Sequence, residues 1–177
     1  NNLDISDDGN FVYVTAFSED AISVFSRNQT TGILTFLQSL KNNTLDGSGN
    51  MITDLDAPQV VYVTDTRVYA ATGVGRSVVV FERNPTTGLL SFVESEVDDM
   101  GDVAFLNDPE GMTLSRDHRF VYATGDEDDG ITVFQDIQIP LPVELMYFKG
   151  KVAKGQAMLY WQTASEFINE GFEIQRS

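Results

Sequence analysis

The sequence predicts an all-β protein built from repeated four-stranded antiparallel sheets. A phrase occurs twice at an offset of 56 residues, as VFSRNQTTGILTFLQS at 24–39 and as VFERNPTTGLLSFVES at 80–95. Each copy is an apolar run, a polar turn that ends in glycine and an alternating apolar run, which is typical of a β-hairpin. A tyrosine also precedes a valine by 11 residues three times, at Tyr13 and Val24, Tyr69 and Val80, and Tyr122 and Val133. Such periodicity indicates a repeat architecture.

Many of the predicted strands are apolar on both faces, as in FVYV, VVYV, VVVF and ITVF. A sandwich strand alternates because one of its faces is wet, whereas these sheets need a neighbour on each side. Radial stacking of four-stranded blades supplies both neighbours, so we expect a β-propeller. An irregular all-β sandwich is the alternative.

The expected strands fall into three sets with tight turns inside each set. They lie at 3–6, 11–15, 21–26 and 33–38, then at 60–63, 68–72, 77–81 and 89–93, and finally at 111–114, 120–124 and 131–134. Polar or acidic connectors occupy 41–58 and 96–108. The third set has no fourth strand, because Pro140 and Pro142 do not fit a ladder strand.

This pattern divides the chain into three expected segments. Residues 1–136 hold the blades, 137–142 form a stiff proline-containing linker, and 143–177 hold further strands at 143–152, 157–163 and 172–175. We expect the blades to be the C-terminal part of a larger propeller, and the outer strand of the last blade to come from upstream of Asn1. Between blades we expect five aromatic side chains to be buried: Phe25, Phe81, Tyr13, Tyr69 and Tyr122.

Composition argues against several classes of function. The chain carries 27 acidic and 11 basic residues, a net charge of −16. So acidic a surface repels phosphate backbones and anionic lipid, which disfavours nucleic-acid and membrane-surface roles. It favours solubility, cation binding or a basic partner. Cysteine is absent, so disulfides and thiolate chemistry are excluded, and no apolar run reaches the length of a membrane span.

Two phrases carry a resemblance to a known family. SDDGNFVYVTAFSEDAISVFSRNQTTGILTF and SRDHRFVYATGDEDDGITVF resemble repeats of the seven-bladed lactonase-type propellers, which include 6-phosphogluconolactonase-like proteins and secreted YVTN-repeat proteins. The resemblance covers Leu3 to about Asp136. It is specific for the fold, because such repeats mark blade geometry and not a reaction.

The last segment carries a second resemblance. LPVELMYFKGKVAKGQAMLYWQTASEFINEGFEIQRS resembles the opening of a fibronectin type III-like domain of the kind found in cargo of type IX secretion. Such a sandwich needs about seven strands, so this one would be incomplete. The resemblance implies a bacterial protein that is secreted or displayed at the cell surface.

The candidate binding residues are acidic and lie in loops expected to share one face of the propeller. We expect an acidic binding face for a cation or a basic partner, formed by Glu19, Asp20, Asp98, Asp99, Asp126, Glu127, Asp128 and Asp129. A solvated acidic rim is the alternative. Calcium prefers six to eight oxygen ligands, and two runs could offer them: Asp46, Asn50, Asp54 and Asp56, or Asp126, Asp128 and Asp129. Apart from calcium, no cofactor is expected.

No set of catalytic residues is evident in the sequence. His118, the only histidine, falls in a predicted turn. Arg27 and Arg83 recur at equal repeat positions, which favours a role in the blade because an active site occurs once. We therefore expect a non-catalytic propeller that binds a protein or glycan at the cell surface, or that has a structural role. The alternatives are a lactonase-like hydrolase of sugar lactones and a structural subunit that pairs with other chains of an extracellular assembly.

Overall fold

The computed structural model describes the whole chain except residues 1, 102, 117, 136–144, 154–155 and 164–177. Contacts divide the chain into two units, Asn1–Gln135 and Asp136–Ser177. In the described residues the only helical element is a single 3-10 turn, η1 (Phe17–Glu19). No helix in this described part is long and apolar enough to cross a membrane.

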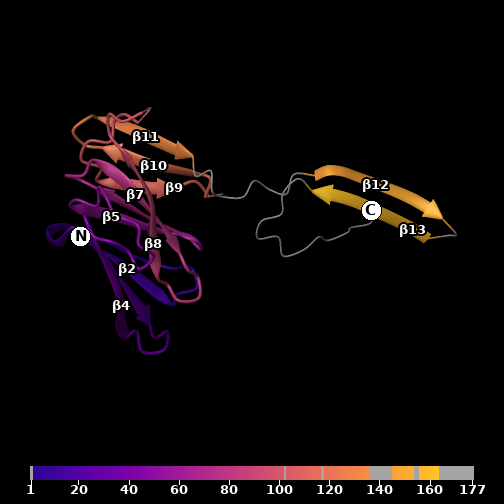
Figure 1. Cartoon of the computed structure of the whole chain (residues 1–177), viewed down its shortest axis with the longest axis horizontal. Helices are drawn as coiled ribbons and strands as arrows, with labels where there is room; N and C mark the ends of the chain where they lie inside the picture. The colour runs from indigo at the N-terminus through magenta and orange to yellow at the C-terminus, as the bar shows by residue number, and fades with distance from the viewer. Residues whose placement is uncertain (1, 102, 117, 136–144, 154–155, 164–177) are drawn as a thin grey trace. The chain divides into compact units, whose positions relative to one another are not determined.

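The first unit consists of three antiparallel sheets, called blades 1, 2 and 3 (Figure 1). Blade 1 contains β1 (Leu3–Ile5), β2 (Phe11–Ala16), β3 (Ala21–Arg27) and β4 (Leu34–Lys41), paired in that order. Blade 2 contains β5 (Pro58–Val63), β6 (Arg67–Thr72), β7 (Ser77–Arg83) and β8 (Leu90–Val97). Blade 3 contains β9 (Gly111–Leu114), β10 (Phe120–Gly125) and β11 (Gly130–Gln135). The prediction of an all-β partial propeller is confirmed.

The duplicated phrase has the same strand geometry in both copies. A register shift, as at a β-bulge, falls after Val24 in the β3–β4 hairpin and after Val80 in the β7–β8 hairpin. An edge-to-face aromatic pair crosses each hairpin with its ring planes at 74°, and the ring centroids are 5.8 Å apart at Phe25–Phe36 and 6.2 Å apart at Phe81–Phe92. Bulges bend a strand at a defined place, so the two blades share one curvature.

The turns of the two hairpins are also alike. The side-chain oxygen of Asn28 accepts the N–H groups of the second and third residues after it at 3.0 and 2.9 Å, and that of Asn84 does the same at 2.9 and 3.0 Å. Gly32 and Gly88 close these turns with φ values of +74° and +73°. Glycine adopts this left-handed conformation without the steric cost of a side chain.

Two apolar cores lie between the sheets, and they define a front and a back face for each blade. The first core joins the front face of blade 1, which includes Tyr13 and Val24, to the back face of blade 2, which includes Phe81. The second joins the front face of blade 2, which includes Tyr69, to the back face of blade 3, which includes Val121. Blade 2 is therefore covered on both faces, as its doubly apolar strands predict.

Whether the five predicted aromatic side chains are buried depends on which blade faces are covered. Tyr13, Tyr69 and Phe81 are buried as expected, and Phe25 is half-buried on the back face of blade 1. The expectation is wrong for Tyr122, which is 36% exposed. Its side chain lies on the front face of blade 3, against which no described residue of a further blade packs.

A buried arginine joins blades 1 and 2. The Arg83 side chain donates from Nε to the Tyr13 hydroxyl at 2.7 Å and from Nη1 to the Asp65 carbonyl at 2.6 Å. The Tyr13 hydroxyl donates in turn to the Gly88 carbonyl at 2.9 Å, and the Asp8 carboxylate lies 3.8 Å from Arg83 Nη2. Burial raises the pKa of Tyr13 although Arg83 opposes this, so the hydroxyl keeps its proton and remains a donor at neutral pH.

Arg27 makes the corresponding contact inside its own blade. Its Nη1 donates to the Gly9 carbonyl in the β1–β2 turn at 3.1 Å, as Arg83 does to the turn of blade 2. The recurrence of the two arginines therefore reflects blade structure.

Side chains of blade 1 satisfy the inner edge of blade 2. Val61 and Val63 in β5 donate their N–H groups to the side-chain oxygens of Asn2 at 3.3 Å and Asp4 at 2.8 Å. An edge strand with free N–H groups is a template for aggregation, and these contacts remove that template.

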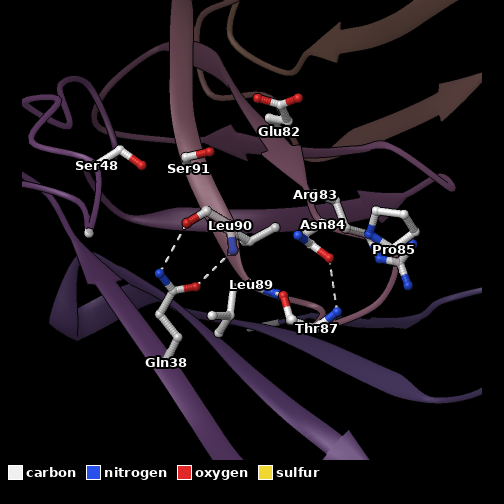
Figure 2. Close-up of a pocket in the computed structure, with 11 residues that line it drawn as sticks. Gln38, Ser48, Glu82, Arg83, Asn84, Pro85, Thr87, Leu89, Leu90 and Ser91 are labelled. Atoms are coloured by element: carbon white, nitrogen blue, oxygen red, sulfur yellow. Dashed lines mark hydrogen bonds between the residues drawn. The ribbon is translucent and has the colours of Figure 1, made fainter.

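The outer edge of blade 2 is satisfied in the same way. The Gln38 amide both accepts from Leu90 N at 2.8 Å and donates to the Leu90 carbonyl at 3.0 Å, as a neighbouring strand would (Figure 2). Asp46 Oδ2 accepts from Phe92 N at 2.8 Å. Both edges of blade 2 thus depend on blade 1 and on the connection that follows it.

The second unit contains one described hairpin, in which β12 (Leu145–Ala153) pairs with β13 (Gln156–Thr163). These strands correspond to the first two expected in this segment, and the third, at 172–175, lies outside the described residues. Among the residues that the structure describes, the sheet of blade 3 consists of β9, β10 and β11. This agrees with the prediction that the third set has no fourth strand of its own; of residues 143–150, which could have supplied one, 143 and 144 lie outside the described residues and β12 pairs with β13.

Candidate functional site

The loops expected to share one face of the propeller do lie together. The connections between blades, 42–57 and 98–110, contact the loops that follow β2, β6 and β10, and we call this surface the upper face. Ala57 N donates to Asp20 Oδ1 at 3.0 Å, and Gly73 N donates to the Ala57 carbonyl at 3.0 Å. Asp126 N donates to the Asp108 carbonyl at 3.2 Å. These hydrogen bonds fix the loops of neighbouring blades against one another.

A hollow of about 350 Å³ opens on the upper face around blade 2. Its walls come from all three blades, and they are lined by Phe17, Gln59, Gly73, Val74, Arg76, Asn107, Asp108 and Glu127. Its volume falls at the lower end of the range usual for small-molecule sites. We call it the upper hollow.

The polar groups of the upper hollow are held in place by one another. Gln59 Nε2 donates to Asp108 Oδ1 at 2.6 Å, which joins the inner strand of blade 2 to the connection that precedes blade 3. Asn107 Nδ2 donates to Glu127 Oε2 at 2.9 Å. Gly73 makes room for the first pair, because a Cβ there would lie 2.1 Å from Gln59 Nε2 and 2.7 Å from Asp108 Oδ1.

Arg76 brings the positive charge of the upper hollow. Its Nη1 lies 3.6 Å from the buried carboxylate of Asp98, and its Nη2 lies 4.0 Å from the exposed carboxylate of Asp99. The hollow therefore combines amide groups, carboxylates, a guanidinium and an aromatic ring. Such a set suits a ligand rich in hydroxyl and carbonyl oxygens.

The eight residues of the predicted acidic face all lie on the upper face, but many of their carboxylates are already engaged. Asp98 Oδ1 accepts Leu106 N at 3.0 Å, and Asp128 Oδ2 accepts Asn107 N at 2.9 Å. Glu19 forms an exposed ion pair with Lys41 at 2.8 Å. The hydrogen bond and charge of Lys41 lower the pKa of Glu19.

Two carboxyl groups of the upper face, those of Asp20 and Asp56, lie side by side. Burial raises the pKa of Asp56, and the negative charge of Asp20 and a hydrogen bond between the two carboxyl groups raise it further. Asp20 belongs to the loop after β2 and Asp56 to the next connection, so the pair marks the boundary of blades 1 and 2.

The Asp46 loop is organised around its aspartate. Asp46 Oδ1 accepts Ser48 N and Asn50 N at 2.8 Å each, and Oδ2 accepts the Asn50 amide at 3.1 Å as well as Phe92 N at 2.8 Å. Burial works to raise the pKa of Asp46, but the N–H groups of Asn50 and Phe92 hold it below its ordinary value. Asp54 Oδ2 accepts from the Ser95 hydroxyl.

Among the residues that the structure describes, no three His, Cys, Asp or Glu side chains are arranged as a metal site. His118 lies in the β9–β10 turn with φ +55° and donates its N–H to the Ser115 carbonyl at 2.9 Å.

A second hollow, of about 620 Å³, lies along the outer seam between blades 1 and 2 (Figure 2). Gln38, Leu90, Asn84 and Thr87 are among its lining residues. In Figure 2 the Gln38 amide points to the backbone of Leu90, and the Asn84 side chain points to Thr87 N. These polar groups stabilise the hairpin and the blade edge, so we assign this hollow a structural role.

Sequence reasoning missed the upper hollow. Gln59, Asn107 and Asp108 carry no motif, and they meet only because two blades pack together. Gly73 was the available signal, since a glycine at the end of a strand often marks close approach of other groups.

Comparisons with known proteins agree with this architecture. The family model "Lactonase, 7-bladed beta-propeller" matches residues 1–105. No curated protein matches the chain. Two solved structures, a protein assigned as a 6-phosphogluconolactonase from Bacteroides uniformis (16% identity, TM-score 0.61) and the periplasmic gluconolactonase of Pseudomonas aeruginosa (22%, 0.60), each match 77% of this chain.

A third structure, a protein of unknown function from Desulfotomaculum acetoxidans, is 23% identical over 76% of the chain, with a TM-score of 0.57. At these identities the structures show the fold alone. The chain spans 36%, 35% and 39% of their lengths, or little more than a third. The family model covers more than half of the 177 residues. The chain therefore belongs to the lactonase family of seven-bladed β-propellers.

Proposed function

We propose that the protein is a lactonase-type hydrolase of a sugar lactone, and that the upper hollow forms part of its substrate-binding surface. The observation that carries this proposal is a polar hollow, built by three blades, in a chain that belongs to the lactonase family. The names of two fold neighbours, a 6-phosphogluconolactonase and a gluconolactonase, support the same class of substrate. This replaces a non-catalytic module as the preferred function.

The upper hollow offers the groups that lactone hydrolysis needs. Water attacks the ester carbonyl carbon, a base takes its proton, and the ring oxygen leaves with a proton as the new hydroxyl. Asp108 would take the proton from water, and Arg76 would stabilise the negative charge that develops on the carbonyl oxygen. The Gln59 and Asn107 amides would hold the sugar hydroxyls, and Phe17 would lie against the apolar face of the ring.

The test compares two carboxylates on the same face. Asp108→Asn keeps the shape of the hollow but removes the base, so kcat/KM for glucono-δ-lactone should fall by a factor of about 100 or more. Asp129→Asn, an exposed change outside the lining of the hollow, should leave kcat/KM unchanged. Turnover no faster than spontaneous hydrolysis, or full activity in Asp108→Asn, would refute the proposal.

Gly73→Ala tests the hollow without removing any polar group. The added methyl group displaces the ends of two flexible side chains, Gln59 and Asp108, so folding should be retained. We expect a higher KM, measured with the same lactone, and a melting temperature close to that of the unsubstituted protein. An unchanged KM would place the substrate elsewhere.

Binding without catalysis is the second candidate function. It is favoured by the hydrogen bonds that already occupy Asp20, Asp98 and Asp128, which make the upper face a pre-organised recognition surface. A lactone or glycan that raises the melting temperature but is not turned over would select this function. A basic protein partner remains a proposal for the acidic face, and binding that weakens steeply with salt would support it.

Calcium remains a proposal for the turn at Asp126, Asp128 and Asp129. We prefer this turn to the Asp46 loop because four N–H groups already bind the Asp46 carboxylate. A rise in melting temperature with added calcium, lost in Asp126→Asn but kept in Asp46→Asn, is the expected result. Equal melting temperatures with calcium and with chelator would exclude the site.

We further propose that the protein is exported and that 143–177 begins a fibronectin type III-like domain after the 137–142 linker. The periplasmic location of one fold neighbour and the β12–β13 hairpin support this proposal. Proteolysis should cut within 137–142 and leave 1–136 intact. Recovery of the protein only from the cytoplasm of its host would refute export.

A further inference from the structure

Charge is separated between the two ends of the blades. Among the described residues of the first unit, five basic side chains belong to the end opposite the upper face: Arg27, Arg67, Arg83, Arg116 and Arg119. The upper face has Arg76 and Lys41, and each lies beside a carboxylate, Arg76 at 3.6 Å from Asp98 and Lys41 at 2.8 Å from Glu19. Within the described blades, the upper face therefore offers an anion no cation that lacks a carboxylate partner.

The upper hollow itself is acidic. Its lining contains the carboxylates of Asp108 and Glu127 and one cation, Arg76. Arg76 lies 4.0 Å from Asp99 in addition to its contact with Asp98, so its charge is already balanced. A phosphate group carries a charge of about −1.5 to −2 at neutral pH, and like charges repel one another across a hollow of this size. A phosphate group placed here would therefore be repelled.

The hydrogen bonds inside the upper hollow leave mainly acceptors for a ligand. Gln59 donates from Nε2 to Asp108 Oδ1 at 2.6 Å, and Asn107 donates from Nδ2 to Glu127 Oε2 at 2.9 Å. Each carboxylate keeps a second oxygen, and each amide keeps its carbonyl oxygen. Sugar hydroxyls can donate to these oxygens, whereas the oxygens of a phosphate dianion are acceptors themselves. The hollow thus suits hydroxyl groups better than phosphate.

Comparison of the three blades singles out Glu127. It is the second residue of the loop after β10, and the second residues of the loops after β2 and β6 are Ser18 and Val74. The last residue of each loop has the same left-handed backbone, with φ values of +50°, +47° and +49° at Asp20, Arg76 and Asp129. The blade accepts serine or valine at the second position, so it does not require the carboxylate of Glu127.

We infer that Glu127 determines substrate specificity by excluding phosphorylated sugars from the upper hollow, so that the substrate is an unphosphorylated lactone rich in hydroxyl groups. The inference rests on the function proposed above and narrows it. Glu127 repels phosphate through its charge, and the oxygens of Glu127 and Asn107 accept hydrogen bonds from sugar hydroxyls. Because the repulsion is electrostatic, added salt weakens it.

The experiment compares kcat/KM for glucono-δ-lactone and for its 6-phosphate in the full-length protein. We expect the unphosphorylated lactone to be preferred by about tenfold or more. Glu127→Gln removes the charge but keeps an oxygen that can accept from Asn107, so this preference should fall by about threefold or more, mainly through a lower KM for the 6-phosphate. Added salt should raise kcat/KM for the 6-phosphate more in the unsubstituted protein than in Glu127→Gln.

Glu82→Gln is the matched control, because it removes the same charge from an exposed position in the hollow at the outer seam (Figure 2). It should leave the preference unchanged. The rest of the protein is identical in both variants, so a difference between them reports on the upper hollow. A preference for the 6-phosphate, an unchanged preference in Glu127→Gln, or an equal change in Glu82→Gln would overturn the inference and leave the proposed hydrolase standing.

A binding measurement separates this inference from the proposed function. If neither lactone is turned over, the proposed hydrolase is refuted, and the inference is decided by titration calorimetry with 1,5-anhydroglucitol and its 6-phosphate, which have the ring but no ester. Tighter binding of the unphosphorylated ring, with a smaller difference in Glu127→Gln, would support the inference. Equal binding of the two rings, binding of neither, or tighter binding of the 6-phosphate would overturn it.

Discussion

Removing one buried oxygen atom tests how the first two blades are joined. Tyr13→Phe deletes the hydroxyl that accepts from Arg83 Nε and donates to the Gly88 carbonyl. Tyr13 is fully buried and Arg83 is 3% exposed, so water cannot replace the lost partner easily. Among the described residues, the Arg83 Nη2 atom already has no hydrogen-bond partner, so the substitution leaves this guanidinium with one donated hydrogen bond, to the Asp65 carbonyl.

The magnitude follows from the two bonds that are lost. A hydrogen bond to a charged group contributes about 1.5–3 kcal/mol and a neutral one about 0.5–1.5 kcal/mol. We therefore expect Tyr13→Phe to lower the free energy of unfolding by about 3 kcal/mol. For a unit of this size, that loss corresponds to a fall in melting temperature of roughly 10 °C.

Tyr122→Phe is the matched control, because it makes the same change on the open front face of blade 3. Urea denaturation of both variants, followed by circular dichroism, measures the difference. Tyr122→Phe should alter the free energy of unfolding by less than about 0.5 kcal/mol. If the two variants lost equal stability, the bridge through Tyr13 and Arg83 would not hold the blades together.

Three further substitutions probe separate features, each by thermal or urea denaturation. Gly88→Ala should destabilise the fold more than Gly32→Ala, because both strain a left-handed turn while only the first pushes against Phe11; equal losses would contradict the packing of that turn on blade 1. Asp46→Ala should cost about 1–3 kcal/mol by leaving buried N–H groups without an acceptor, and the cost should shrink as acid protonates the native carboxylate. Asp56, whose pKa is raised, destabilises the fold as pH rises through that pKa. Asp56→Asn should therefore raise the melting temperature at pH 7 but not at pH 3. A higher melting temperature at both pH values would show that the charge of Asp56 is not the cause.

Much of the fold could be predicted because its signals are periodic. The spacing of Tyr13 from Val24 recurs in every blade, and each blade pairs those residues in the same register. Burial of Tyr122 was predicted wrongly because periodicity assigns a residue to a face but does not say what covers that face.

The side-chain contacts between blades could not be predicted in this way. The Gln38–Leu90 and Gln59–Asp108 bonds join residues 52 and 49 positions apart, and no pattern in the sequence links them. The acidic loops illustrate the same difficulty. Charge alone does not distinguish a carboxylate that can bind a cation from one that already accepts N–H groups, as Asp46 does.

The dependence of blade 2 on blade 1 also bears on how such chains grow. Arg27 and the turn that ends in Gly32 repeat Arg83 and the turn that ends in Gly88, so a duplicated copy of blade 1 placed directly before blade 2 would meet a matching surface on both sides. Gene duplication in units of 56 residues could therefore lengthen the arc without new compensating substitutions. A copy of blade 2 would not match in this way, because β6 begins with Arg67 where β2 of blade 1 begins with Phe11.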